Sequence, residues 1–351
     1  MKHIKIFGTP WHLGHQVSLL KLADYTNAEF TWIVNPFRKW ADSIRKQPEH
    51  LNWATHYEPG KYDVAILHID QQCVDPTIGK GMLYRQLNET IQDIPKIVIN
   101  HGTPMWPELG VDEDVIINGG EIIRKGEKIK IEGMKKMIGN NTMVVNSHEA
   151  VKRWGWGQSI IHGMDNEEWQ DGVKEPRAIT MISPAGLDKY YNRRLLSDLK
   201  TMLREKYGYT LIQITVDYEA KDFNDYKRFL GNSLVYVNPT LDSPMPRGRT
   251  EAMLSGCCVL TTKYHDADTF IENGKNGFII PNNPETIVDL IGMILNEGYK
   301  EAAKIGQEGK KTAQRLFSNK RFLKDWMAII NKVLASKKEI TWNGSEESSN
   351  E

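Results

Sequence analysis

The sequence has no apolar run approaching the roughly 18 residues that a membrane-spanning helix needs. Its first residues, MKHIKIFGTPWHLG, lack the apolar segment of a secretory signal and instead predict a β-strand. Cysteine is scarce, because only Cys73, Cys257 and Cys258 occur in 351 residues, and they do not form a disulfide framework. These absences argue against a membrane-spanning or disulfide-stabilised secreted protein, and we expect a cytoplasmic chain.

Net charge is also absent, because 45 Lys and Arg residues balance 45 Asp and Glu residues. This balance argues against a dedicated nucleic-acid-binding protein, although it leaves room for a local basic face. One such stretch, residues 121–136, holds six Lys or Arg against three Glu. It would suit contact with an anionic molecule or peripheral contact with a membrane surface, and an ordinary solvated helix or hairpin face explains it as well.

What the sequence does contain is enough apolar material for two domains, since 40% of its 351 residues are hydrophobic. Short apolar runs alternate with helical patterns, which is typical of an α/β fold with parallel sheets. We expect a first domain at residues 1–170 and a second at 178–318, joined by a polar linker. A final amphipathic helix is predicted at 319–338, followed by a disordered polar tail at 339–351.

The most informative stretch runs from residue 234 to residue 281 and predicts a strand, a loop, a short helix and a second strand. Ligands of parallel sheets bind beyond the carboxyl ends of the strands, and a helix N-terminus suits phosphate. Arg247 and Arg249 add positive charge there, and the Glu251 carboxylate is suited to accept from ribose hydroxyls. A capped helix with two solvated arginines explains the same residues equally well.

From Glu251 onward, this stretch resembles the donor site of GT-B glycosyltransferases, especially the retaining, family 4-like members of glycosyl transferases group 1. In that family a glutamate, seven residues and a second glutamate are followed by Ala, a small-residue turn with Gly and an apolar strand. The resemblance assigns Glu251 the family's ribose-binding role, whereas Ser243 stands in place of the first glutamate, which contacts the transferred sugar. The matching residues are Glu251-Ala252-Met253, Gly256, the strand from Cys257 to Thr262, Glu272-Asn273-Gly274 and Asn276-Gly277-Phe278.

The resemblance implies a GT-B fold, with two Rossmann-like domains facing across a cleft and a last helix that crosses back to the first domain. It also implies where the diphosphate of the donor binds. Family members use two basic residues after a glycine that corresponds to Gly186, but here Leu187 and Asn192 occupy those two positions. Lys189, Arg193 and Arg194 are near enough to substitute, although a helix from Asn192 would also place the two arginines on a solvated first turn. The rest of the implied donor site is Met245, Pro246, Gly248 and Thr250.

The first domain would hold the acceptor in the loop after its first strand. The implied residues are Gly8, Thr9, His12 and Gly14, although the glycines match no dinucleotide or P-loop fingerprint. The Gly14-His15 pair resembles the loop that supplies the general base of inverting GT-B enzymes. A histidine bonded to backbone explains His15 as well.

A second candidate catalytic residue, His101, lies at the carboxyl end of the apolar strand predicted at residues 94–102. It resembles the family's strand-end histidine, which faces the transferred sugar. An ordinary turn residue is the competing interpretation. If His15 were the base, inversion of the anomeric centre would be expected instead of retention.

The function implied by the resemblance is transfer of a hexose from a nucleotide-diphosphate sugar, UDP- or GDP-linked, with retention. No cofactor or metal is expected, because helix dipole and arginines would stabilise the leaving diphosphate and no cluster with metal-ligand spacing appears. The acceptor could be a glycan, lipid, protein or modified nucleic acid. Two alternatives remain open: an inactive nucleotide-sugar-binding protein and a GT-B nucleotide-sugar epimerase.

Overall fold

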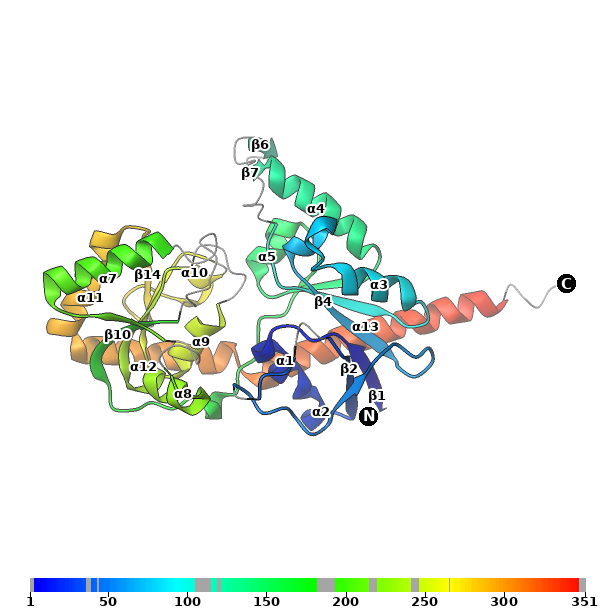
Figure 1. The fold of residues 1–351 in the computed structure, drawn as a ribbon, viewed down its shortest axis with the longest axis horizontal. Helices are drawn as coiled ribbons and strands as arrows, with labels where there is room; N and C mark the ends of the chain where they lie inside the picture. The colour runs from blue at the N-terminus through cyan, green and yellow to red at the C-terminus, as the bar shows by residue number, and fades with distance from the viewer. Residues whose placement is uncertain are drawn as a thin grey trace. The chain divides into compact units, whose positions relative to one another are not determined.

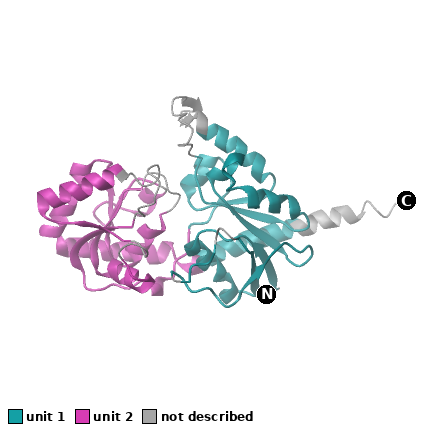
Figure 2. Cartoon of the chain, in the orientation of Figure 1, with its two compact units in different colours: residues 1–161, 322–351 teal, residues 162–321 magenta. Residues whose placement is uncertain are grey.

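The computed structural model describes residues 3–35, 39–42, 44–104, 115–118, 121–181, 193–214, 220–240, 246–264 and 266–346. The chain divides into two compact units (Figure 2). Unit 1 consists of residues 1–161 together with 322–351, and unit 2 consists of residues 162–321. Each unit is a parallel β-sheet covered by helices, which confirms the predicted α/β class (Figure 1).

Seven parallel strands form the sheet of unit 1, in the order β3-β2-β1-β4-β5-β8-β9. Because all run in one direction, their carboxyl ends share one edge of the sheet. The strands are β1 (Ile4–Gly8), β2 (Ala28–Ile33), β3 (Leu51–Ala54), β4 (Val64–Ile69), β5 (Lys96–Asn100), β8 (Thr142–Val145) and β9 (Gln158–Ser159).

The helices of unit 1 follow these strands in the alternating pattern expected for parallel connections. A small antiparallel hairpin, β6 (Val115–Asn118) and β7 (Glu121–Arg124), precedes α4 (Lys125–Ile138), so the basic stretch forms part of a hairpin and a helix. The other helices are α1 (Leu13–Leu20), α2 (Leu22–Tyr25), η1 (Gln71–Val74), η2 (Pro76–Ile78), α3 (Met82–Thr90) and α5 (His148–Trp154).

The last helix, α13 (Asn319–Glu346), returns the chain to unit 1. Phe322, Trp326 and Ile330 recur at a spacing of four residues, so they lie on one face of the helix. All three are buried in the same apolar cluster as Ile6 and Ile66 of the central strands. This face therefore completes one side of the unit 1 core.

The sheet of unit 2 has five parallel strands in the order β11-β10-β12-β13-β14. Helix α7 packs beside α11, and α12 packs beside α9 (Figure 1). The strands are β10 (Glu175–Thr180), β11 (Leu211–Gln213), β12 (Ser233–Asn238), β13 (Cys258–Thr262) and β14 (Phe278–Ile280). The helices are η4 (Asn166–Glu168), α7 (Arg193–Tyr207), α8 (Phe223–Asn232), α9 (Arg247–Leu254), α10 (Ala267–Phe270), α11 (Pro284–Asn296) and α12 (Tyr299–Leu316).

The structure places the division between the units nearer the N-terminus than the sequence predicts, at residue 162 instead of 170. The reason is a local pairing within unit 2. The backbone N–H of Met164 donates to Phe317 at 2.7 Å, and the N–H of Asn319 donates to Met164 at 3.1 Å. These bonds fix the start of unit 2 to its last residues, so unit 2 extends to residue 321 and not 318.

Other boundaries also differ from expectation. Residues 36–60 contain the edge strand β3, whose last three residues, Asn52 to Ala54, are not buried and give no long apolar signal. Helix α13 continues to Glu346, into the segment predicted to be a disordered tail. Within the described residues, no helix has the length and apolar character to cross a membrane.

Candidate functional site

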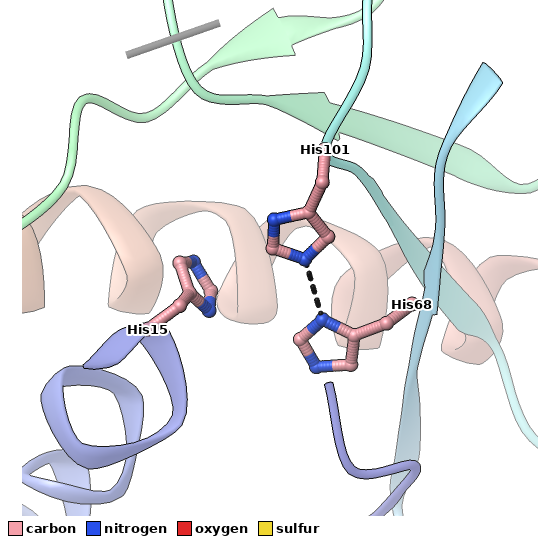
Figure 3. Close-up of side chains that lie close together, drawn as sticks. All are labelled: His15, His68 and His101. Atoms are coloured by element: carbon pink, nitrogen blue, oxygen red, sulfur yellow. Dashed lines mark hydrogen bonds between the residues drawn. The ribbon is translucent and has the colours of Figure 1, made fainter. Parts of the chain in front are cut away.

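Three histidines meet at the carboxyl edge of the unit 1 sheet (Figure 3). His68 lies in β4, His101 directly follows β5, and His15 lies on α1, the helix after β1. Their nearest ring nitrogens all lie within 4.8 Å of one another. All three side chains are buried, at 7%, 3% and 8% exposure for His15, His68 and His101.

Hydrogen bonds fix the ring of His101 on both sides. Its Nε2 lies 2.8 Å from Nδ1 of His68, and its Nδ1 lies 3.2 Å from Nδ2 of Asn146. An amide nitrogen only donates, so Nδ1 accepts in this orientation and a neutral His101 donates from Nε2 to His68. Both ring nitrogens of His101 are thus engaged inside unit 1.

Aromatic side chains enclose the same three rings. The indole of Trp11 lies parallel to His68 and His101, with centroid separations of 6.4 and 5.8 Å. His15 stands nearly perpendicular to His101 at 5.1 Å and to Phe322 of α13 at 6.1 Å. The cluster is therefore a packed imidazole and indole group at the sheet edge.

A cation, the Lys80 ammonium, lies beside the indole of this group. The ammonium of Lys80 lies 5.6 Å from the centroid of the Trp11 ring, and it forms an ion pair with Asp70. It also donates to Oε1 of Gln72 at 2.7 Å. Asp70 accepts the backbone N–H of Gln72 at 3.0 Å, so the loop after β4 presents Lys80 in a fixed place.

Of the four residues predicted on the acceptor side, two are packed inside unit 1 and two are accessible at its surface. A Cβ at Gly8 would meet the Trp32 ring at 2.1 Å and the carbonyl oxygen of Ile66 at 2.8 Å, so that glycine serves packing within the sheet. The hydroxyl of Thr9 is buried and accepts the backbone N–H of His68 at 3.1 Å. His12, the N-cap residue of α1, is exposed, and Gly14, in the first turn of that helix, is half-buried, so both are accessible.

In unit 2, the predicted ribose-binding residue Glu251 lies on α9 with 5% exposure. The phenol of Tyr226 donates to its Oε2 at 2.7 Å. Nε of Arg247 lies 3.3 Å from its Oε1, one helical turn away. Each carboxylate oxygen has two lone pairs, so these contacts leave capacity for further donors such as ribose hydroxyls.

The second predicted arginine of the donor site, Arg249, behaves differently from Arg247. Its guanidinium is fully buried, lies 4.9 Å from the Phe270 centroid, and donates to the backbone oxygen of Tyr264 at 3.3 Å. The structure thus gives Arg249 packing contacts inside unit 2 and excludes a solvated position for it, whereas its role in the donor site stays a prediction. Arg247 is half-buried and also donates to the Gly163 carbonyl at 3.4 Å.

The remaining predicted donor residues on the loop and helix are close to these two. Pro246 occupies the N-cap position of α9 and has extended backbone angles. A Cβ at Gly248 would meet Cε of Met181 at 2.4 Å, so the glycine permits close packing against the residue after β10. The buried hydroxyl of Thr250 lies 2.9 Å from Nε2 of His162, so Thr250 ties α9 to the start of unit 2.

Several predicted donor-site residues lie outside the residues that the structure describes. Gly186, Lys189, Ser243 and Met245 lie outside the described residues, as do Leu187 and Asn192. Arg193 begins α7, and its side chain is also outside the description, whereas Arg194 is exposed in the first turn of that helix.

Sequence reasoning missed His68 and the convergence of the three histidines. A signal existed, since His68 stands near the carboxyl end of an apolar strand, as His101 does. The sequence shows no metal-ligand spacing because such spacing relates residues that are near one another in the chain. These three histidines come from three separate elements.

The fold of the chain is that of the GT-B glycosyltransferases. A structure of Anabaena HepE in complex with UDP and glucose matches with a TM-score of 0.65 at 12% identity, over 94% of this chain and 100% of that one. Sucrose-phosphate synthase from Thermosynechococcus elongatus matches with a TM-score of 0.64 at 12% identity, over 95% of this chain and 100% of that one. A glycosyltransferase from Rickettsia africae matches with a TM-score of 0.62 at 14% identity, over 95% of this chain and 99% of that one.

The match to a sequence family covers a shorter segment, which lies within unit 2. Residues 218–312 match the family model of glycosyl transferases group 1, and this segment includes Tyr226 and Glu251. No curated protein matches the chain in sequence. The predicted likeness to GT-B glycosyltransferases is thereby confirmed, and the retaining, family 4-like subclass stays a prediction.

Proposed function

We propose that this protein transfers a hexose from a UDP- or GDP-linked sugar to an acceptor, with retention and without a metal at the diphosphate. The observation that carries the proposal is the buried Glu251 carboxylate, oriented by Tyr226 and Arg247 within the segment that matches glycosyl transferases group 1. The HepE structure, which has the same fold, is a complex with UDP and glucose.

In this proposal, Glu251 accepts hydrogen bonds from the ribose and the N-terminus of α9 stabilises the diphosphate. The first backbone N–H groups of a helix have no partners within the helix, and they carry partial positive charge. Arg247 stands in that first turn with part of its side chain accessible. Charge on the leaving diphosphate is therefore neutralised by protein groups, which removes the need for an ion there.

Thermal unfolding with UDP-, GDP-, ADP- and TDP-sugars and the free nucleotides, each with and without EDTA, tests the donor site. A ligand at 100 times its dissociation constant stabilises the folded state by about 2.7 kcal/mol. We expect nucleotides of one base to raise the melting temperature of the protein by the same amount with and without EDTA. A rise that EDTA abolishes would contradict metal independence, and no rise with any nucleotide would contradict the transferase proposal.

A second candidate function is nucleotide-sugar binding without turnover. It is favoured by the engagement of both His101 ring nitrogens and by Ser243 in place of the family's first glutamate. Slow hydrolysis of the bound donor, measured as free sugar release, separates the two functions. Release above the uncatalysed rate supports the transferase, and binding with no release supports the inactive protein. Release of a sugar of altered configuration would instead indicate an epimerase.

A further inference from the structure

Within the described part of the chain, the three histidines of unit 1 are the one group of three side chains placed closely enough to hold a metal ion. Each contributes one ring nitrogen to a space in which all three nitrogens lie within 4.8 Å of one another (Figure 3). They come from β4, the end of β5 and α1, so the sheet and the first helix fix three separate directions of approach. We propose that His15, His68 and His101 bind one divalent transition-metal ion of the Zn²⁺ class.

The ligand set defines the class of metal. Three neutral imidazoles suit Zn²⁺, Co²⁺, Ni²⁺ or Cu²⁺, and they exclude Mg²⁺ and Ca²⁺, which require oxygen ligands. Three protein nitrogens leave a fourth tetrahedral position for water or another small ligand. The burial of the rings also fits, since a buried site holds its ligands in few rotamers and loses little conformational entropy on binding.

The spacing fits with a small adjustment. Zn–N bonds of about 2.0–2.1 Å in a tetrahedron place two ligand nitrogens about 3.3 Å apart. His68 Nδ1 and His101 Nε2 now lie 2.8 Å apart and share a proton. Binding replaces this proton with the ion and separates the two rings by roughly half an ångström, while His15 rotates inward from its perpendicular position.

Asn146 supplies a second, independent observation. Its Nδ2 faces His101 Nδ1 at 3.2 Å, whereas its Oδ1 is buried with no hydrogen-bond partner in the described part of the chain. A half-turn of the amide places Oδ1 against His101 Nδ1, which then carries the proton and donates it. Nε2 of His101 is left with a lone pair for the ion. Ligating histidines usually donate their second ring N–H in this way.

Zn²⁺ titration of chelator-treated, tag-free full-length protein by calorimetry tests the site. We expect one equivalent to bind, and Co²⁺ to give the visible absorption of a four-coordinate complex. His68→Asn and His15→Asn should each weaken binding at least tenfold. The matched control His56→Asn removes an exposed histidine that bonds Thr55 and should bind as the unchanged protein does.

Asn146→Ala keeps all three ligands and removes only the amide. We expect a roughly 10- to 100-fold weaker affinity with unchanged stoichiometry, as for other residues that orient a ligating histidine. Circular dichroism of each variant establishes that it folds. Absence of Zn²⁺ binding by the unchanged protein would overturn the proposal. Equal affinity in folded His68→Asn and His15→Asn, or loss of binding in His56→Asn, would overturn it as well.

Discussion

The phenol of Tyr226 on α8 donates a hydrogen bond of 2.7 Å to Oε2 of Glu251 on α9. Burial, followed by the charge of Glu251, raises the pKa of Tyr226 well above its usual value. The phenol therefore stays protonated and remains a donor throughout the neutral pH range. Glu251 is held in place by this bond and by Arg247 before any ligand binds.

The first prediction concerns this bond. Tyr226→Phe removes a hydrogen bond to a charged group, and we expect the free energy of unfolding to fall by about 1.5–3 kcal/mol. Urea denaturation measures the change. Tyr25→Phe, at a residue 66% exposed, is the control and should change stability little. Equal stability of both variants would show that the Tyr226 bond is not formed in solution.

Glu251→Ala should weaken nucleotide binding by about 1.5–3 kcal/mol, because it removes a charged acceptor for paired hydroxyls. Calorimetric titration with the nucleotide identified by thermal unfolding measures the loss. Glu301→Ala removes an exposed carboxylate paired with Lys304 and serves as the control. Unchanged affinity in a folded Glu251→Ala protein would remove this residue from the donor site.

His101→Ala should lower turnover more than nucleotide affinity, because the predicted role of His101 concerns the transferred sugar and not the nucleotide. Donor hydrolysis rates and calorimetric affinities, measured on one preparation, give the two numbers to compare. His56→Ala is the control for removal of an imidazole. An equal loss of turnover and affinity, or no loss, would argue against a sugar-facing role.

Gly306 of α12 lies against the chain that enters β13. A Cβ at this residue would meet the backbone oxygen of Gly256 at 2.3 Å, and backbone cannot move aside as a side-chain end can. Gly306→Ala should therefore destabilise the fold by about 1–2 kcal/mol, because overpacking of about 1–3 kcal/mol exceeds the helix propensity gain of up to about 1 kcal/mol. Thermal unfolding checks this, with exposed Lys304→Ala as the control on the same helix. A melting temperature for Gly306→Ala that matches the control would mean that the helix shifts without cost.

Alkaline pH should destabilise the protein through its buried thiols. Burial raises the pKa of Cys257 to about 11, and that of Cys73 and Cys258 to about 12, from 9.0. The folded state thus favours the protonated thiol, and this contribution is complete below pH 9 and is lost as pH rises toward 11 or 12. Cys258→Ala should show a shallower fall in unfolding free energy from pH 9 to pH 11, by up to about 1.4 kcal/mol per pH unit. Parallel pH profiles for the two proteins would contradict the raised pKa.

The sequence predicted elements that local residues determine. Asn283 accepts the Thr286 N–H at 2.8 Å at the start of α11, and Pro284 follows it, a pair of residues typical of a helix start. Glu251 lies on a short helix between two strands in sequence, as expected. The short edge strand β3 was missed because it lacks a buried apolar run.

What the sequence could not supply was the direction of long side chains and the meeting of distant ones. Arg249 is buried because Phe270 and the Tyr264 carbonyl lie beside it, and neither contact can be inferred from the pattern around residue 249. His15, His68 and His101 meet because the strand order places β1, β4 and β5 side by side. The order of strands in a sheet is set by long-range packing, which a local pattern does not report.

The return of α13 to unit 1 has a consequence for folding during synthesis. The strands of unit 1 leave the ribosome before unit 2 does, but Phe322, Trp326 and Ile330, which cover one side of the unit 1 core, leave it only after unit 2. Unit 2 is continuous, so it can close its own core before unit 1 is complete. Until the final helix docks, a nascent chain exposes the apolar face formed by Ile6 and Ile66, and this face is where a chaperone would be expected to bind.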